Sequence, residues 1–220
     1  YSAETKNLLY DVTLERLQVS ELEKCEKTVV LGGMEFYNQN TNTKCWFLND
    51  KDKYFPTRWE EIADVPKDAH AKQAQMVCLP LQRAFAILCG GNNHTRNMMF
   101  SMETKSWSEM PLCPESMVNP AVVYNDHAIY VLSDKGVVYH MDMKASELSW
   151  EKDPPLPWSH AWPIVTSMGN SLYTVSKTDT TLYKYDTLCT EWYKITNKPQ
   201  QARCNEGVTL APVEPCLYLV

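Results

Sequence analysis

Tryptophan recurs along this chain at nearly constant intervals. The series consists of Trp59, Trp107, Trp150 and Trp192, which are separated by 48, 43 and 42 residues. A proline follows each member and closes its segment: Pro66, Pro111, Pro157 and Pro199. A sequence period of roughly 20–50 residues indicates a repeat architecture, in which each repeat is one supersecondary unit. We therefore expect the 220 residues to fold as a series of similar units.

Each unit also contains a short apolar run. The runs are TVVLGG at 28–33, FAILCGG at 85–91, AIYVLSD at 128–134, SLYTVSK at 171–177 and CLYLV at 216–220. They are rich in β-branched and aromatic residues and are broken by turn residues, so they predict strands and not helices. Units of roughly 40–50 residues that hold several short strands are typical of a β-propeller. Its four-stranded blades pack face to face around an axis.

The motifs within the units resemble the Kelch repeat. That repeat has an apolar strand ending in Gly-Gly, a Tyr-Asp-like pair, a tryptophan about seven residues further on and a closing proline. Gly32-Gly33 and Gly90-Gly91 match the diglycine, and Tyr185-Asp186 with Trp192 matches the second half. The chain is similar over about residues 28–220 to the Kelch part of BTB-Kelch proteins.

Two units depart from the Kelch pattern. Ser133-Asp134 and Ser176-Lys177 stand where the glycines are expected. Met141-Asp142 precedes Trp150 by nine residues, two more than the usual spacing. The resemblance therefore rests on repeated copies in register and not on any single motif.

The expected fold is all-β, a Kelch-type β-propeller that is incomplete. About four and a half four-stranded blades are visible of the six that such a ring usually has. The expected blades span approximately 28–66, 67–111, 112–157, 158–199 and, in part, 200–220. Residues 1–27 are expected to form a linker or the end of an upstream helical domain. The chain is accordingly expected to be a piece of a longer protein.

Charge and composition exclude several classes of partner. The net charge is −6 and no dense run of Lys and Arg occurs, which argues against nucleic acid and anionic membranes. No apolar stretch is long enough to span a bilayer. The eight cysteines show no C-x-x-C spacing, and several lie in apolar runs. We expect them to be reduced, buried thiols of a cytoplasmic or nuclear protein.

The sequence offers no catalytic or cofactor motif. The five histidines are scattered without metal-ligand spacing, so no metal and no cofactor are expected. We expect His127 and His140 at strand ends or in turns. SDKGVVY at 133–139 superficially resembles the Asp-box of sialidase propellers, but it lacks the residue between Ser and Asp and the final Trp, so it predicts a turn. Nucleotide-binding and nucleophile-elbow motifs are missing too, and the chain is expected not to be an enzyme.

Function in a propeller is carried by the loops at its ends. In the Kelch family, the resemblance implies that partners contact two sets of loops. One set joins an outer strand to the next blade, and the other joins the second and third strands of a blade. Large, partly exposed side chains and charged groups in these loops are the candidate partner-binding residues. They are Asn93, His94, Arg96, Asp134, Trp158, His160, Trp162 and Arg203.

The resemblance implies a non-catalytic protein-interaction module. The expected role is substrate recognition in an adaptor of a cullin-RING ubiquitin ligase. Its partners would be a protein substrate or peptide, and a cullin bound through an upstream BTB region. One alternative is a cytoskeletal Kelch scaffold that binds actin. Another is a catalytic propeller of the oxidase or sialidase kind.

Overall fold

The computed structural model describes eleven segments of the chain. These are residues 29–31, 44–49, 58–66, 75–88, 96–115, 117, 120–157, 163–176, 181–197, 210–213 and 216–219. The secondary structure in these segments consists of antiparallel strands and the turns between them. None of the described residues forms a helix long and apolar enough to cross a membrane.

The strands form five separate sheets, which we number as blades in chain order. Blade 1 contains β1 (Val29–Leu31), β2 (Cys45–Asn49) and β3 (Arg58–Ile62). Blade 2 contains β4 (Gln75–Leu79), β5 (Ala84–Leu88), β6 (Asn97–Ser101) and β7 (Ser106–Met110). Blade 3 contains β8 (Ala121–Asn125), β9 (Ala128–Leu132), β10 (Val138–Asp142) and β11 (Glu151–Asp153). Blade 4 contains β12 (Pro163–Met168), β13 (Ser171–Ser176), β14 (Thr181–Asp186) and β15 (Glu191–Asn197). In blade 5, β16 (Leu210–Val213) pairs with β17 (Cys216–Leu219).

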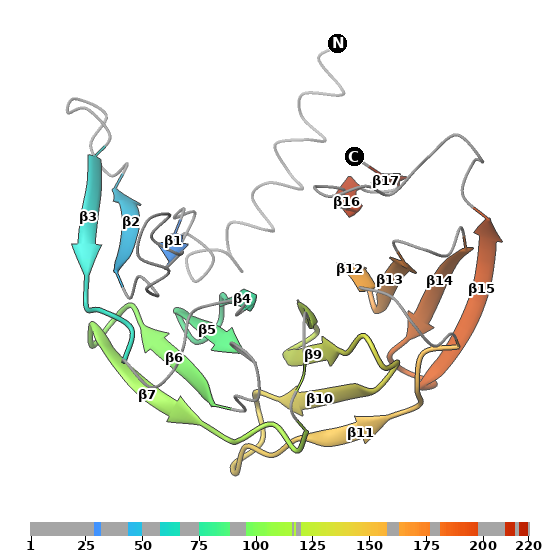
Figure 1. Ribbon diagram of the computed structural model, residues 1–220, viewed down its shortest axis with the longest axis horizontal. Helices are drawn as coiled ribbons and strands as arrows, with labels where there is room; N and C mark the ends of the chain where they lie inside the picture. The colour runs from blue at the N-terminus through green and yellow to red at the C-terminus, as the bar shows by residue number, and fades with distance from the viewer. Residues whose placement is uncertain are drawn as a thin grey trace, which may run out of the picture.

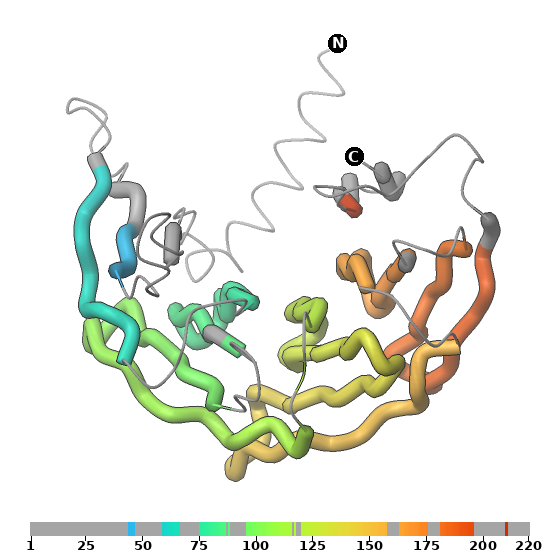
Figure 2. Tube along the Cα trace, in the orientation of Figure 1, coloured from blue at the N-terminus to red at the C-terminus, as the bar shows by residue number. Residues whose placement is uncertain are grey.

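The blades follow one another along an arc (Figure 1). The first strands β4, β8, β12 and β16 line the inside of the arc, where β8 contacts both β4 and β12, and β12 contacts β16. The last strands β3, β7, β11 and β15 lie on the outer perimeter, and the trace in Figure 2 follows the same curve. The prediction of an all-β fold built from four-stranded blades is confirmed.

The five apolar runs of the sequence all occupy the second-strand position of a blade. They correspond to β1, β5, β9, β13 and β17. Every residue of β9 is buried, because this strand has neighbouring strands on both sides and blades against both faces. The strands of each sheet lie within one of the predicted blade intervals, and the interval bounds themselves remain predictions. Residues 1–27, the expected linker, lie outside the described residues.

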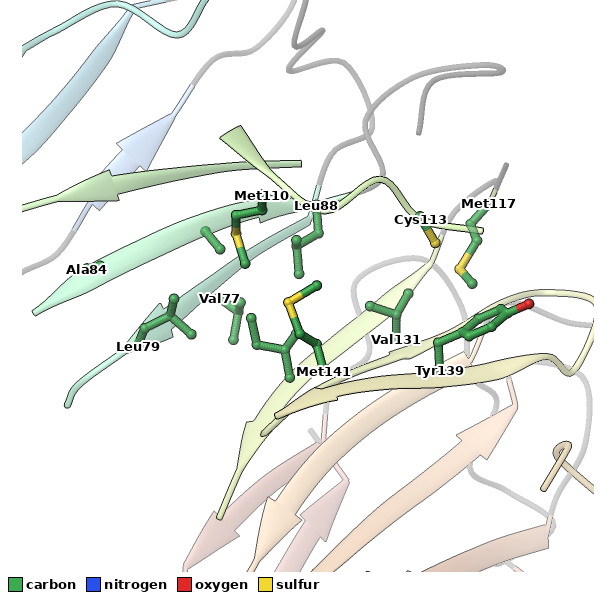
Figure 3. Packing of buried hydrophobic residues seen from close by; sticks show 12 residues of the cluster. Val77, Leu79, Ala84, Leu88, Met110, Cys113, Met117, Val131, Tyr139 and Met141 are labelled. Carbon is green, nitrogen blue, oxygen red and sulfur yellow. The ribbon is translucent and has the colours of Figure 1, made fainter. Parts of the chain in front are cut away.

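The hydrophobic core lies between blades and not within any one of them. The largest cluster joins Val77 and Leu88 of blade 2 to Val131 and Met141 of blade 3 (Figure 3). A second cluster joins blades 3 and 4, and a third joins blades 1 and 2. Side chains on a strand alternate between the two faces of the sheet, so blades 2 and 3 each contribute to the cluster on either side.

The expectation for His140 is wrong, and the expectation of buried cysteines holds only in part. His140 lies in the middle of β10 and not at a strand end, with its side chain one-quarter exposed. Cys45 and Cys113 are buried, whereas Cys78 and Cys189 are exposed. An apolar run alternates its faces, so a cysteine inside one is not necessarily covered.

The two ends of the blades are built differently. At one end, which we call the turn end, backbone amides of the turn between the third and fourth strands donate to the turn between the first and second. The bonds are Met102 N to Arg83 O, Met143 N to His127 O and Thr187 N to Asn170 O, at 2.9, 2.8 and 3.2 Å. The opposite end, the loop end, holds the turns between second and third strands and the segments that leave each outer strand.

Candidate interaction surface at the loop end

The tryptophans of the repeat join each blade to the segment that leaves the previous one. Trp107 Nε1 donates to the carbonyl oxygen of Ala63 at 2.9 Å, and Trp192 Nε1 donates to that of Pro154 at 3.0 Å. Trp150 Nε1 donates to Pro111 O at 3.1 Å. Each acceptor is the first residue after an outer strand, so the same hydrogen bond recurs at three successive blade boundaries.

The three segments share a four-residue pattern. They are 63–66, 111–114 and 154–157. The first residue accepts from the tryptophan, the second is exposed, the third is buried and the fourth is proline. The structure therefore places Pro114, and not Pro111, in the position of Pro66 and Pro157.

The buried third residue fixes each segment to the core. These residues are Val65, Cys113 and Leu156, and each belongs to the cluster at its own blade boundary. Met117 adds a second buried contact after Cys113, and Figure 3 shows both beside Tyr139. Proline at the fourth position restricts the backbone further. A segment fixed in this way loses little conformational entropy when a partner binds it.

The exposed second residue differs from one segment to the next. It is Asp64, Leu112 or Pro155. Leu112 is 63% exposed although its neighbour Cys113 is 3% exposed. A leucine that projects from a rigid support is a group that a protein partner could desolvate with little reorganisation.

A polar cluster fixes the segment after β7 onto blade 3. The hydroxyl of Tyr139 donates to Glu115 Oε1 at 2.8 Å, and Lys152 Nζ lies 3.5 Å from the same oxygen. The ammonium group of Lys152 also lies 5.7 Å from the centre of the Tyr139 ring. Burial and the hydrogen bond to Glu115 raise the pKa of Tyr139 to about 12, so this phenol stays protonated and remains a donor.

The turn between β9 and β10 lies beside the segment after β11. Within the turn, Gly136 N donates to Ser133 O and Ser133 N donates to Val137 O. Gly136 has a φ of +80°, a backbone conformation that glycine adopts without steric cost. Leu156 N donates to Gly136 O at 2.8 Å. The two sets of loops named in the sequence prediction are therefore in direct contact in blade 3, and residues 133–137 form the predicted turn.

Two of the predicted site residues fall within the described part of the chain. Asp134 is half-buried in the turn between β9 and β10. Arg96 directly precedes β6, and its Nη2 lies 3.5 Å from Glu109 Oε1. The remaining predicted residues lie outside the described segments: Asn93, His94, Trp158, His160, Trp162 and Arg203.

A buried carboxylate connects blades 3 and 4. Asp153, the last residue of β11, accepts a hydrogen bond from the hydroxyl of Tyr185 at 2.9 Å. Its other oxygen lies 2.9 Å from Nδ1 of His140, which acts as a donor toward a carboxylate. The hydrogen bond to Asp153 raises the pKa of His140. Burial, followed by the charge of Asp153, raises the pKa of Tyr185. Because Asp153 is 7% exposed and both its oxygens have partners, we assign it a structural role.

Sequence reasoning missed Leu112, Glu115, Tyr139 and Lys152. A signal for Leu112 was present, since a Pro-Leu-Cys-Pro segment follows Trp107 at the position where Pro-Pro-Leu-Pro follows Trp150. The contacts of Glu115 with Tyr139 and Lys152 join positions 24 and 37 residues apart, and the sequence carries no signal for them.

Comparison with known proteins bears on the fold alone. No protein-family model matches the chain, and no curated protein matches it significantly. Among solved structures, 237 chains match it. One of these, described as the structure of YjhT, superposes with a TM-score of 0.56 at 13% identity and covers 70% of this chain. The chain spans 59% of the length of that protein.

The fold and the repeated blade contacts define the class of protein. Successive antiparallel sheets lie face to face along an arc, with their first strands inside and their last strands outside. The chain has a β-propeller fold, and its loop end carries the candidate interaction surface.

Proposed function

We propose that this chain is a non-catalytic protein-interaction module that binds its partner at the loop end. The observation that carries the proposal is the exposed Leu112 on a segment held by the buried Cys113 and Met117. Pro155 occupies the equivalent position one blade further on, and Asp134 lies in the adjoining turn. A partner that spans blades 2 and 3 would meet an apolar group flanked by charged ones.

The resemblance to the Kelch part of BTB-Kelch proteins extends this proposal. The partner would be a substrate presented to a cullin-RING ubiquitin ligase, and the chain would be the part of the adaptor that recognises it. The repeated motifs in the sequence support this role.

Two exposed leucines provide a matched pair for the test. Leu112 lies at the loop end, and Leu188, which is 73% exposed, lies in the turn between β14 and β15 at the turn end. The wild-type chain, Leu112→Asp and Leu188→Asp are each immobilised as bait, and the captured proteins are compared. Each captured protein is then purified and titrated against the three chains. We expect Leu188→Asp to bind like wild type and Leu112→Asp to bind at least about tenfold more weakly, as for an anchor residue. Equal binding by all three baits would contradict the loop-end site.

The ubiquitin role has its own test. If a captured protein is a ligase substrate, inhibiting cullin activation should lengthen its half-life in cells, and depleting the protein that contains this chain should do the same. A partner that is captured through Leu112 but whose half-life does not change would support the scaffold alternative instead.

A further inference from the structure

Blade 3 carries a histidine beside a glutamate near its outer edge. His140 of β10 lies directly opposite Glu151 of β11 in the antiparallel register. Residues directly opposite each other project on the same face of a sheet, so the two side chains are neighbours. Nε2 of His140 lies 3.9 Å from Oε2 of Glu151. The two side chains are 25% and 72% exposed, so the pair is open to solvent.

The other nitrogen of this imidazole is held from the interior. Nδ1 of His140 donates to Asp153 at 2.9 Å, and the second oxygen of Asp153 accepts from the hydroxyl of Tyr185. The ring also stacks on Tyr130, with centroids 5.6 Å apart and planes at 28°. These contacts fix the tautomer and the orientation of the ring. Neutral His140 therefore carries its lone pair on Nε2, the nitrogen beside Glu151.

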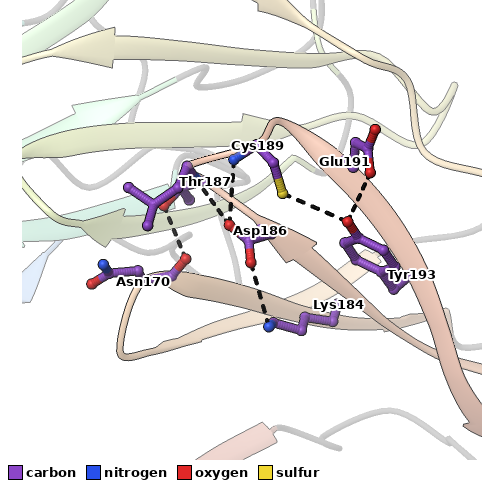
Figure 4. Close-up of polar contacts among 8 residues, drawn as sticks. Asn170, Lys184, Asp186, Thr187, Cys189, Glu191 and Tyr193 are labelled. Atoms are coloured by element: carbon purple, nitrogen blue, oxygen red, sulfur yellow. Dashed lines mark hydrogen bonds and ion pairs between the residues drawn. The ribbon is translucent and has the colours of Figure 1, made fainter.

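The equivalent position in the other blades holds different residue types. In each blade the residue directly after the tryptophan pairs with a residue of the third strand, or of β2 in blade 1. In blade 4 the two polar side chains bond to Asp186 and Glu191 of their own blade (Figure 4). Among the described blades, blade 3 alone pairs a histidine with a carboxylate here, so the fold itself does not require this pair. The other pairs are Phe47 with Glu60, Met99 with Ser108, and Lys184 with Tyr193.

A histidine that donates one N–H to a carboxylate has the usual form of a metal ligand. The second nitrogen of a metal-bound imidazole almost always donates to a carboxylate, a carbonyl or water, which orients the ring and raises its basicity. Zinc lies about 2.0–2.2 Å from imidazole nitrogen and carboxylate oxygen, so tetrahedral geometry places these two atoms about 3.4 Å apart. The observed separation is 3.9 Å, and a small rotation of the exposed Glu151 side chain closes the difference.

The charges around the imidazole favour a cation. The charged groups that act on His140 are Asp153, Glu151 and Asp142, and all three are carboxylates. Asp142 lies two residues beyond His140 on β10 and therefore projects from the same face. No group of three potential metal ligands converges within the described part of the chain. A metal ion at this place would therefore have two protein ligands, with water at its remaining positions.

We propose that His140 and Glu151 bind a zinc ion on blade 3, with Asp153 as the residue that positions the imidazole. The histidines are scattered along the sequence, and their spacing predicted no metal. This pair instead comes from two strands joined across the sheet, which spacing along the chain does not reveal. The site does not depend on the loop end, and neither Leu112 nor its segment takes part in it.

A second histidine provides a matched control. Nε2 of His127 also lies 3.9 Å from a carboxylate oxygen, that of Asp126. Its Nδ1, however, is buried without a hydrogen-bond partner among the described residues. The two pairs therefore share the same separation and differ in the carboxylate that holds the ring from behind. If any exposed pair of histidine and carboxylate were sufficient, both would bind zinc alike.

Zinc titration of the 220-residue chain tests the proposal. Isothermal titration calorimetry in excess Mg²⁺ measures the affinity, and NMR of the imidazole nitrogens identifies the histidine that binds. Other cysteines and histidines of the chain can also bind zinc, so each variant is judged by the equivalents of zinc that it removes. Melting of each variant in a chelator, compared with wild type, verifies that it is folded at the temperature of the titration. Because Glu151 is exposed, Glu151→Gln should melt like wild type.

The variants decide between an oriented site and incidental binding. We expect His140→Gln and Glu151→Gln each to remove one equivalent of zinc, and His127→Gln to remove none. Asp153→Asn should weaken zinc binding about tenfold or more, as loss of an orienting carboxylate does. Zinc binding that survives Glu151→Gln, or that falls equally in His127→Gln, overturns the proposal. Displacement of zinc by Mg²⁺ overturns it too, since that ion prefers sites made of oxygen ligands. Full affinity in Asp153→Asn would contradict the positioning role.

Discussion

The indole of Trp150 donates a hydrogen bond to the carbonyl oxygen of Pro111, 39 residues earlier in the chain. The same oxygen accepts from Nδ2 of Asn97 at 2.8 Å, so the segment leaving blade 2 is tied both to its own blade and to the next. Trp107 and Trp192 make the equivalent bond at the neighbouring boundaries. The repeat thus couples blades through side-chain to backbone bonds as well as through apolar packing.

The first prediction concerns this bond. Trp150→Phe should lower the free energy of unfolding by about 1–2 kcal/mol, because it leaves the carbonyl one donor short and removes part of the packed ring. Trp150→Ala should lower it by about 3 kcal/mol or more. Equilibrium urea unfolding measures both. Trp59, which is 51% exposed, is the control, and its change to Phe should cost less than about 0.5 kcal/mol. Equal effects at Trp59 and Trp150 would contradict the role of the bond.

The second prediction concerns the pair of Asp153 and Tyr185. Tyr185→Phe should cost about 1–3 kcal/mol, because it removes a donor from a buried carboxylate. Asp153→Met should also destabilise the protein, since it leaves the Tyr185 hydroxyl buried and unpaired. Met110 and Met141 show that an apolar pair fits the equivalent position. The double change Asp153→Met with Tyr185→Met should therefore lower the free energy of unfolding by less than the sum of the two single methionine changes. Strict additivity in this double-mutant cycle would count against the pairing.

The third prediction concerns pH. Hydrogen bonding to Asp153 raises the pKa of His140 above its usual 6.5 in the folded protein. The folded protein therefore binds the proton of His140 more tightly than the unfolded protein does. Protonation of His140 therefore stabilises the folded protein. This stabilisation is complete below pH 6.5 and is lost as pH rises through the higher folded-state pKa.

Thermal melting at a series of pH values measures this loss. The melting temperature of wild type should fall more than that of His140→Gln between pH 6 and the region above the folded-state pKa. The other groups near the imidazole are Tyr130, Glu151 and Asp142, and Tyr185 bonds to the same carboxylate, Asp153. Tyr130 and Tyr185 stay neutral in this range, since burial raises the pKa of both. An NMR titration of His140 that shows a pKa at or below 6.5 would contradict the prediction.

The fourth prediction separates stability from binding at the loop end. Arg96 and Glu109 form an exposed ion pair, and such pairs contribute less than about 1 kcal/mol. Arg96→Glu should therefore change the melting temperature little but weaken partner binding if the loop end is the partner site. Adding Glu109→Arg recreates the ion pair in reverse without returning a positive charge to position 96. Partner binding that recovers fully in the double variant would show that Arg96 acts only through its ion pair.

The sequence alone determined the unit of this fold. The spacing of Trp107, Trp150 and Trp192 predicted separate blades, and the apolar runs predicted their second strands. Both patterns are local and repeated, and a four-stranded antiparallel blade needs only contacts between neighbouring strands. The alternation of strand faces also follows from backbone geometry alone.

Only the tertiary structure decided how the blades meet. Nothing in the sequence indicates that Asp153 accepts a hydrogen bond from Tyr185 or that Glu115 accepts one from Tyr139. Nor does it indicate that Trp107, Trp150 and Trp192 donate to the residue after the previous outer strand. These partners lie 24 to 44 residues apart and come together because neighbouring blades stack face to face. The same stacking buries Cys113 and exposes Leu112, its neighbour in the chain. Exposure depends on which face another blade covers, and that is a property of the assembled blades rather than of the residue itself.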